Sequence, residues 1–155
     1  MSFYPCRGGS ASETVKRYLL KNGKFDPEFS GISGSGVNSG EVTVTSDGIV
    51  IKRSGNADKT FGSNGSVDLS GYKTLIVEVD ILVAHEDATI DLDLSTQKNT
   101  SWSDSHHYVC GLPVTMNGLH KVVLDISSIS GSKYFVFYNW DNSTYTYTIK
   151  SIGLG

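Results

Sequence analysis

Cysteine is scarce in this 155-residue chain, which contains only Cys6 and Cys110. The two residues lie far apart in the sequence, and neither belongs to a Cys-x-x-Cys pair, the spacing typical of zinc and redox sites. The sequence therefore favours two separate reduced thiols over a metal site or a disulfide framework.

A surplus of basic residues is also missing, because 13 Lys and Arg residues face 16 Asp and Glu residues. The lysines are scattered singly, which argues against nucleic acid as a partner. No apolar run is long enough to span a bilayer, so we expect no membrane insertion. Residues 1–7 lack the charged and apolar regions of a signal peptide, and we expect the chain to be made and folded in a cytoplasm.

Short segments with a period of two, separated by turns rich in Gly and Asn, make up most of the chain from residue 41 onward. The predicted strands are 41–45, 49–53, 74–83, 88–95, 108–116, 119–126, 134–140 and 145–152. This pattern predicts an all-β fold, specifically a jelly-roll β-sandwich of two antiparallel sheets.

The strands 74–83 and 88–95 are central to this prediction, and the short segment between them is typical of a hairpin. Antiparallel pairing places Ile81 opposite Ile90 on an apolar face, which a second sheet would cover. The same register gathers four carboxylates on the other face, with Glu78 opposite Asp93 and Asp80 opposite Asp91.

Like charges that face each other across two strands are destabilising, so an offsetting group is expected. One candidate is a calcium ion, which binds carboxylate oxygens. Another is a basic neighbour such as Lys121 or Lys150, or a basic patch on a partner chain. The remaining alternative is a solvated, negatively charged outer face.

A second candidate site is aromatic. It draws on the predicted strands 134–140 and 145–152, which we expect to pair as a closing hairpin. The loop at 96–106 contributes further residues. Aromatic rings that stack on sugars, together with polar groups that bond sugar hydroxyls, would form a glycan-binding platform. Its candidate residues are Trp102, His107, Tyr138, Trp140, Asp141, Asn142 and Tyr145. The alternative is simple packing, because a strand that is apolar on both faces is usually fully buried.

Residues 1–40 differ from the rest, since glycine, serine and proline interrupt regular patterns there. We therefore divide the chain into an N-terminal arm, 1–40, and a sandwich, 41–155. Within the arm, residues 17–21 precede Asn22-Gly23, which favours a strand entering a tight turn. The alternative is a short helix opened by a capping box at residues 10–13.

Four stretches, 67–75, 123–131, 134–138 and 147–153, resemble the jelly rolls of carbohydrate-binding modules. In that family a strand before an Asp-Ile-Ser-x-x-Ser-Gly turn leads into an aromatic strand. Residues 1–9 resemble the starts of small virion proteins of phages and prophages of gut bacteria. These resemblances imply a tail, baseplate or head-fibre protein, located in the virion. Such a protein would assemble through its arm with other virion proteins and with copies of itself, and would bind cell-surface glycans.

Residues 78–81 also resemble the Glu-x-Asp-x-Glu strand of jelly-roll glucanases, but Leu82 occupies the position of the third acid. Two carboxylates about 5 Å apart would suit a retaining glycosidase. Because the third acid is missing, we expect no enzyme activity. The alternative to a virion protein is a carbohydrate-binding module, free-standing or appended to an enzyme.

Overall fold

The computed structural model describes residues 2–5, 14–37, 40–54, 59–86, 88, 90–98, 106–112, 115–139 and 144–155. Every regular element in these ranges is a β-strand, and none of them contains a helix able to cross a membrane. The strands are β1 (Ser2–Pro5), β2 (Arg17–Lys21), β3 (Lys24–Phe25), β4 (Ile32–Gly34), β5 (Val42–Thr45), β6 (Gly48–Ser54), β7 (Lys59–Ser63), β8 (Val67–Asp68), β9 (Thr74–Val83), β10 (Ile90–Ser95), β11 (His106–Gly111), β12 (Gly118–Asp125), β13 (Ser132–Asn139) and β14 (Thr144–Leu154).

The larger sheet has the order β1-β12-β9-β14-β2-β3, and β6, itself paired with β5, also lies against β14. β14 pairs with β9 on one side, and on the other side with β6 near its start and β2 near its end. The pairing of β1 with β12 is parallel, whereas the other pairings of this sheet within the described residues are antiparallel. β14 is therefore the central strand of this layer.

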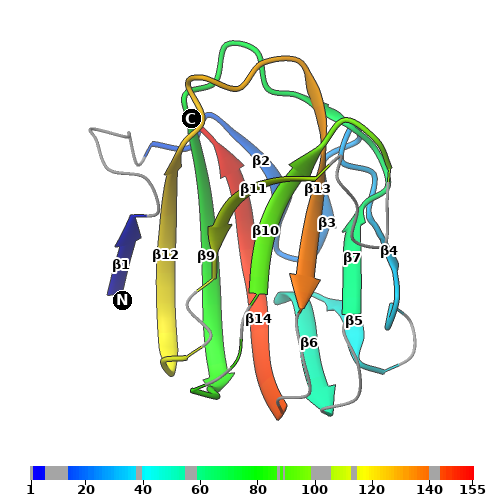
Figure 1. Cartoon of the computed structure of the whole chain (residues 1–155), viewed down its shortest axis with the longest axis vertical. Helices are drawn as coiled ribbons and strands as arrows, with labels where there is room; N and C mark the ends of the chain where they lie inside the picture. The colour runs from blue at the N-terminus through cyan, green and yellow to red at the C-terminus, as the bar shows by residue number, and fades with distance from the viewer. Residues whose placement is uncertain are drawn as a thin grey trace.

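The smaller sheet has the order β11-β10-β13-β7-β4, and β8 pairs with one end of β13. Its described pairings are antiparallel. Figure 1 shows the two sheets as layers along the viewing direction. The predicted all-β sandwich of two antiparallel sheets is confirmed.

The core lies between the two sheets and is built from one face of each strand. β9 contributes alternate residues from Leu75 to Ile81, and β10 contributes Ile90, Leu92 and Leu94. Phe61 and Phe137 stack across neighbouring strands of the smaller sheet, with ring centroids 5.1 Å apart. Burying one such side chain stabilises a fold by about 1.5–3 kcal/mol, so period-two patterning holds the sandwich together.

Two hairpins that we predicted from the sequence, 74–95 and 134–152, are wrong. β9 pairs with β12 and β14, whereas β10 pairs with β11 and β13, so the segment between them crosses from one sheet to the other. β13 and β14 are likewise in different sheets. The physical reason is that alternation specifies which face of a strand is buried, and a strand can bury that face equally well from either sheet. Sheets pack about 10 Å apart, a distance that a few extended residues can span.

The predicted boundary at residue 40 falls inside the sandwich. β2 extends the larger sheet and β4 extends the smaller one, while Leu19, Leu20 and Phe29 are fully buried in the core. Residues 14–37 are therefore part of the domain body rather than a separate arm.

The tight turn that we predicted after residue 21 is confirmed. Asn22 and Gly23 have positive φ angles of 53° and 73°, as a two-residue turn between strands requires. A Cβ at Gly23 would clash with the carbonyl oxygen of Thr45, which explains why glycine occupies this position. Beyond the turn, the Arg17 guanidinium donates two hydrogen bonds to Asp26, at 2.9 and 2.7 Å, and holds the pKa of that carboxyl below its ordinary value. These contacts fix the chain between β2 and β4.

Candidate functional site

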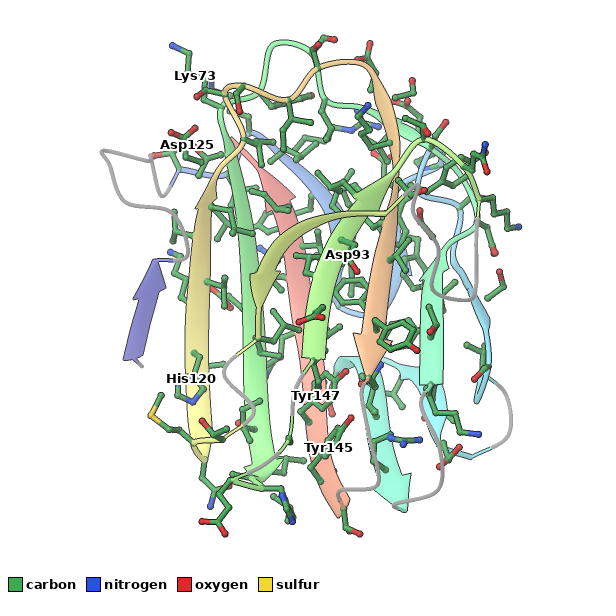
Figure 2. All side chains as sticks on the ribbon, in the orientation of Figure 1. Lys73, Asp93, His120, Asp125, Tyr145 and Tyr147 are labelled. Carbon is green, nitrogen blue, oxygen red and sulfur yellow. The ribbon has the colours of Figure 1, made fainter. Side chains whose placement is uncertain are left out.

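The outer face of the smaller sheet carries the most unusual chemistry among the described residues. Because Ile90, Leu92 and Leu94 point into the core, strand alternation directs Asp91, Asp93 and Ser95 to the opposite, outer face. Figure 2 shows Asp93 on β10 in the middle of this sheet.

The neighbouring strand β13 supplies the cross-strand partners of these residues. Phe135 and Phe137 face the core, so Tyr134, Val136 and Tyr138 face outward. In the register of the two strands, Tyr138 lies opposite Asp91, Val136 opposite Asp93, and Tyr134 opposite Ser95. We call the set Asp91, Asp93, Ser95, Tyr134, Val136 and Tyr138 the outer-face site.

Asp93 is completely buried although it belongs to an outer face. Within the described part of the chain, neither of its carboxylate oxygens has a hydrogen-bond partner. Burial, and secondly the nearby charge of Asp91, raises the pKa of Asp93 to about 6. A buried carboxylate without a donor or a counter-charge is costly, and proteins usually keep such a group only where it has a task.

The predicted ladder of four carboxylates does not exist, because β9 and β10 belong to different sheets. Glu78 and Asp80 lie on the outer face of the larger sheet, where Lys121 and Ser151 flank Glu78. Asp91 and Asp93 lie on the outer face of the smaller sheet, on the far side of the core. One calcium ion therefore cannot bind all four, and the described residues contain no group of three or more metal-ligating side chains.

A basic neighbour was the second group that we expected to offset these charges, and Glu78 has one. Its register partner on β12 is Lys121. The carboxylates of the larger sheet therefore belong to a mixed, partly exposed charged surface.

The predicted aromatic platform is not assembled from its two described members. Tyr145 points into the core and is fully buried, so it cannot offer its ring to a sugar. Tyr138 does lie on the outer face, but only 8% of its surface is exposed. Trp102, Trp140, Asp141 and Asn142 lie outside the described residues, as does the side chain of His107.

A buried polar cluster lies between the sheets and was not predicted. The Tyr147 hydroxyl donates to Asn139 Oδ1 at 2.6 Å, and Asn139 Nδ2 donates to the Lys59 carbonyl at 3.2 Å. The Tyr145 hydroxyl also lies 3.4 Å from Asn139 Oδ1, and Figure 2 shows both tyrosines on β14. Burial raises the pKa of Tyr147 well above its ordinary value, so this hydroxyl remains protonated.

Arg53 belongs to the same end of the sandwich. It is buried because it shares the inward face of β6 with Ile49 and Ile51, and its Nη1 lies 3.5 Å from Glu41 Oε1. Lys59 Nζ lies 3.4 Å from the other oxygen of that carboxylate. A polar residue at an inward position, read from the alternation of β6 and β13, is the sequence signal that could have identified Arg53 and Asn139.

Chemically, the outer-face site offers hydrogen-bond acceptors and tyrosine rings, which suits binding. The residues that resemble a glucanase strand lie elsewhere, on β9, and Leu82 is more than half exposed at the position of the third acid. The described residues therefore contain no copy of that three-acid strand.

No protein-family model matches the chain, and no curated protein matches it. Among solved structures, the fold is similar to TmCBM61, a carbohydrate-binding module solved in complex with β-1,4-galactotriose. The two structures superpose with a TM-score of 0.50 and 17% sequence identity, over 90% of this chain and 99% of the other. At this identity the likeness shows the fold and assigns no ligand.

Proposed function

We propose that this chain is a non-catalytic glycan-binding domain and that glycans bind at the outer-face site. The observation that carries the proposal is the fold likeness to TmCBM61, which spans almost all of both chains. That protein was solved with a bound β-1,4-galactotriose, so a sandwich of this shape supports sugar binding in at least one relative by fold.

The composition of the outer-face site fits the chemistry of sugars. Sugar hydroxyls donate hydrogen bonds, and carboxylates are the strongest acceptors among side chains. Asp91 is partly exposed and lies opposite Tyr138, so an acceptor and an aromatic side chain are cross-strand neighbours on the sheet. Trp140, the residue that follows β13, together with Trp102, His107, Asp141 and Asn142, remains a predicted part of this site.

Catalysis by the Asp91–Asp93 pair is the competing interpretation. A carboxyl with a raised pKa beside a second carboxyl is the arrangement that glycosidases use. The fold likeness is to a carbohydrate-binding module, and the described residues hold no copy of the three-acid glucanase strand beside this pair. These observations favour a binding role.

A virion location, assembly through residues 1–40 with other virion proteins, and homo-oligomerisation rest on the sequence resemblance alone. They stay predictions. The fold likeness to TmCBM61 supports the simpler description as a carbohydrate-binding domain.

A glycan array followed by calorimetry tests the proposal. We expect the wild-type chain to bind at least one neutral oligosaccharide. The Trp140→Ala variant should bind it at least tenfold more weakly, because the apolar face of the sugar can no longer stack on the indole ring. Tyr18→Ala is the matched control, since Tyr18 is an exposed aromatic residue on the larger sheet. Absence of binding across the array, or equal losses in both variants, would contradict the proposal.

A further inference from the structure

The starting observation is the unsatisfied state of Asp93. The residue has no exposed surface, and both carboxylate oxygens lack a partner in the described part of the chain. Isolated buried charges are avoided in proteins unless they are paired or bind an ion. The residue thus implies a missing group of opposite charge or a missing set of donors.

The described neighbours do not supply that group. The register partner of Asp93 on β13 is Val136, and the adjacent pairs are Asp91 with Tyr138 and Ser95 with Tyr134. On the other side, β11 places Tyr108 opposite Asp93 and His106 opposite Ser95 along the backbone. The ion pairs found in the described residues involve Arg17, Arg53 and Lys59, and they join Asp26, Glu28 and Glu41 instead.

Asp91 adds a second carboxylate on the same face. Residues two apart on a strand point in the same direction, with Cα atoms about 7 Å apart. Asp91 is partly exposed, whereas Asp93 is buried. One carboxylate of the pair is therefore accessible to solvent and the other is not. Two carboxylates in this arrangement repel each other, and a positive charge between them would relieve that repulsion.

We propose that Asp91 and Asp93 bind a positively charged group, either a metal ion or the ammonium group of an amino sugar. The location of a sugar at this face rests on the proposed function. An ammonium group offers three donors to the two carboxylates. Calcium takes carboxylate oxygens together with other oxygen ligands, which the hydroxyls of a bound glycan can supply. The pair therefore selects cationic or cation-assisted glycans and disfavours acidic ones such as uronate-bearing chains.

Thermal unfolding and calorimetry at pH 6.5, where amino-sugar amines carry a positive charge and Asp91 is ionised, distinguish the two sources. The probes are calcium chloride alone, a glucosamine hexamer with free amines, and its fully N-acetylated counterpart, which has the same backbone without the charge. We expect calcium or the free-amine hexamer to raise the wild-type Tm by several degrees. A shift with calcium assigns a metal ion, and a shift with the free-amine hexamer alone assigns an ammonium group.

Isosteric variants locate the site. Asp93→Asn and Asp91→Asn should each reduce the ligand-induced Tm shift at least fivefold, since each removes one negative charge without changing the volume. Glu78→Gln is the matched control on the larger sheet and should keep the full shift. Because the readout is the shift on adding the probe, a change in the Tm of a free variant does not affect it.

The inference is overturned if neither probe shifts the wild-type Tm at millimolar concentration, or if Asp93→Asn responds as the wild type does. Binding of neutral glycans without any preference for a cation would also overturn it while leaving the proposed function intact. Conversely, a calcium-induced shift in a chain that binds no glycan would support the cation site and contradict the proposed function.

Discussion

Asp93 shows how one residue can depart from the pattern that surrounds it. It occupies an outward position of β10, where a charged side chain is expected, yet it is completely buried. Alternation in the sequence indicates the direction in which Asp93 points, and this direction was predicted correctly. The burial was not predictable, because it depends on neighbours distant in the sequence, such as Val136 on the paired strand β13.

The raised pKa of Asp93 makes the stability of the protein depend on pH. Between about pH 4 and pH 6 the folded state keeps a proton that the unfolded state has lost, so the free energy of unfolding falls as pH rises through this window. Raising the pKa from its ordinary 3.8 to about 6 changes the free energy of unfolding by about 3 kcal/mol between low and high pH. This stabilisation is present below pH 4 and is lost as the pH rises past about 6. We expect Asp93→Asn to remove this loss, making the variant more stable than the wild type at pH 7.5.

Urea unfolding at pH 4.5 and pH 7.5, in a chelating buffer, measures this effect. The difference between variant and wild type isolates Asp93, since other groups such as Asp26 contribute equally to both proteins. Glu78→Gln should keep the pH slope of the wild type. An identical slope in the wild type and Asp93→Asn would show that Asp93 titrates alike in the folded and unfolded states.

At the scale of elements, the sequence predicted where strands lie better than which strands pair. The strand from Thr74 to Val83 was predicted with its bounds and its buried face. Its pairing with β10 was wrong, because a hairpin and a crossing between sheets bury the same residues. Pairing depends on the packing of the whole sandwich, and a single period-two pattern carries no information about it.

The N-terminal region was predicted wrongly for a different reason. Its glycine content was given more weight than the spacing of its large apolar residues. Frequent glycines suggested an arm, and the buried Leu19, Leu20 and Phe29 were not recognised as core residues. Several of these glycines serve turns, as Gly23 does with its positive φ. Glycine-rich segments with isolated large apolar residues are therefore compatible with short strands of a sandwich.

Truncation tests this correction. A chain that begins at Gly40 lacks β2, β3 and β4, and it loses three fully buried side chains that together contribute at least about 5 kcal/mol. Because domains are stable by only about 5–15 kcal/mol, we expect this truncation to abolish cooperative unfolding or to lower the Tm by more than 15 °C. A chain that begins at Thr14 is the control and should retain cooperative unfolding. A Gly40 truncation with an unchanged circular dichroism melt would restore the idea of a separate arm.

At the scale of the whole molecule, the two outer faces differ in chemistry. The larger sheet presents acidic and basic groups together, as Glu78 beside Lys121 illustrates. The smaller sheet carries the partly exposed Asp91 and the buried Asp93 beside tyrosines. The sequence identified Asp91, Asp93 and Tyr138 as candidates but joined the two acids to the wrong strand, since the site depends on the pairing of β10 with β13.

The central claim is that glycans bind the outer face of the smaller sheet, and a ¹H–¹⁵N NMR titration with a glycan selected from the array tests it most directly. The account predicts chemical-shift changes concentrated in the amides of β10 and β13, with β9 and β12 little affected. Changes confined to the larger sheet, or none at saturating glycan, would contradict it.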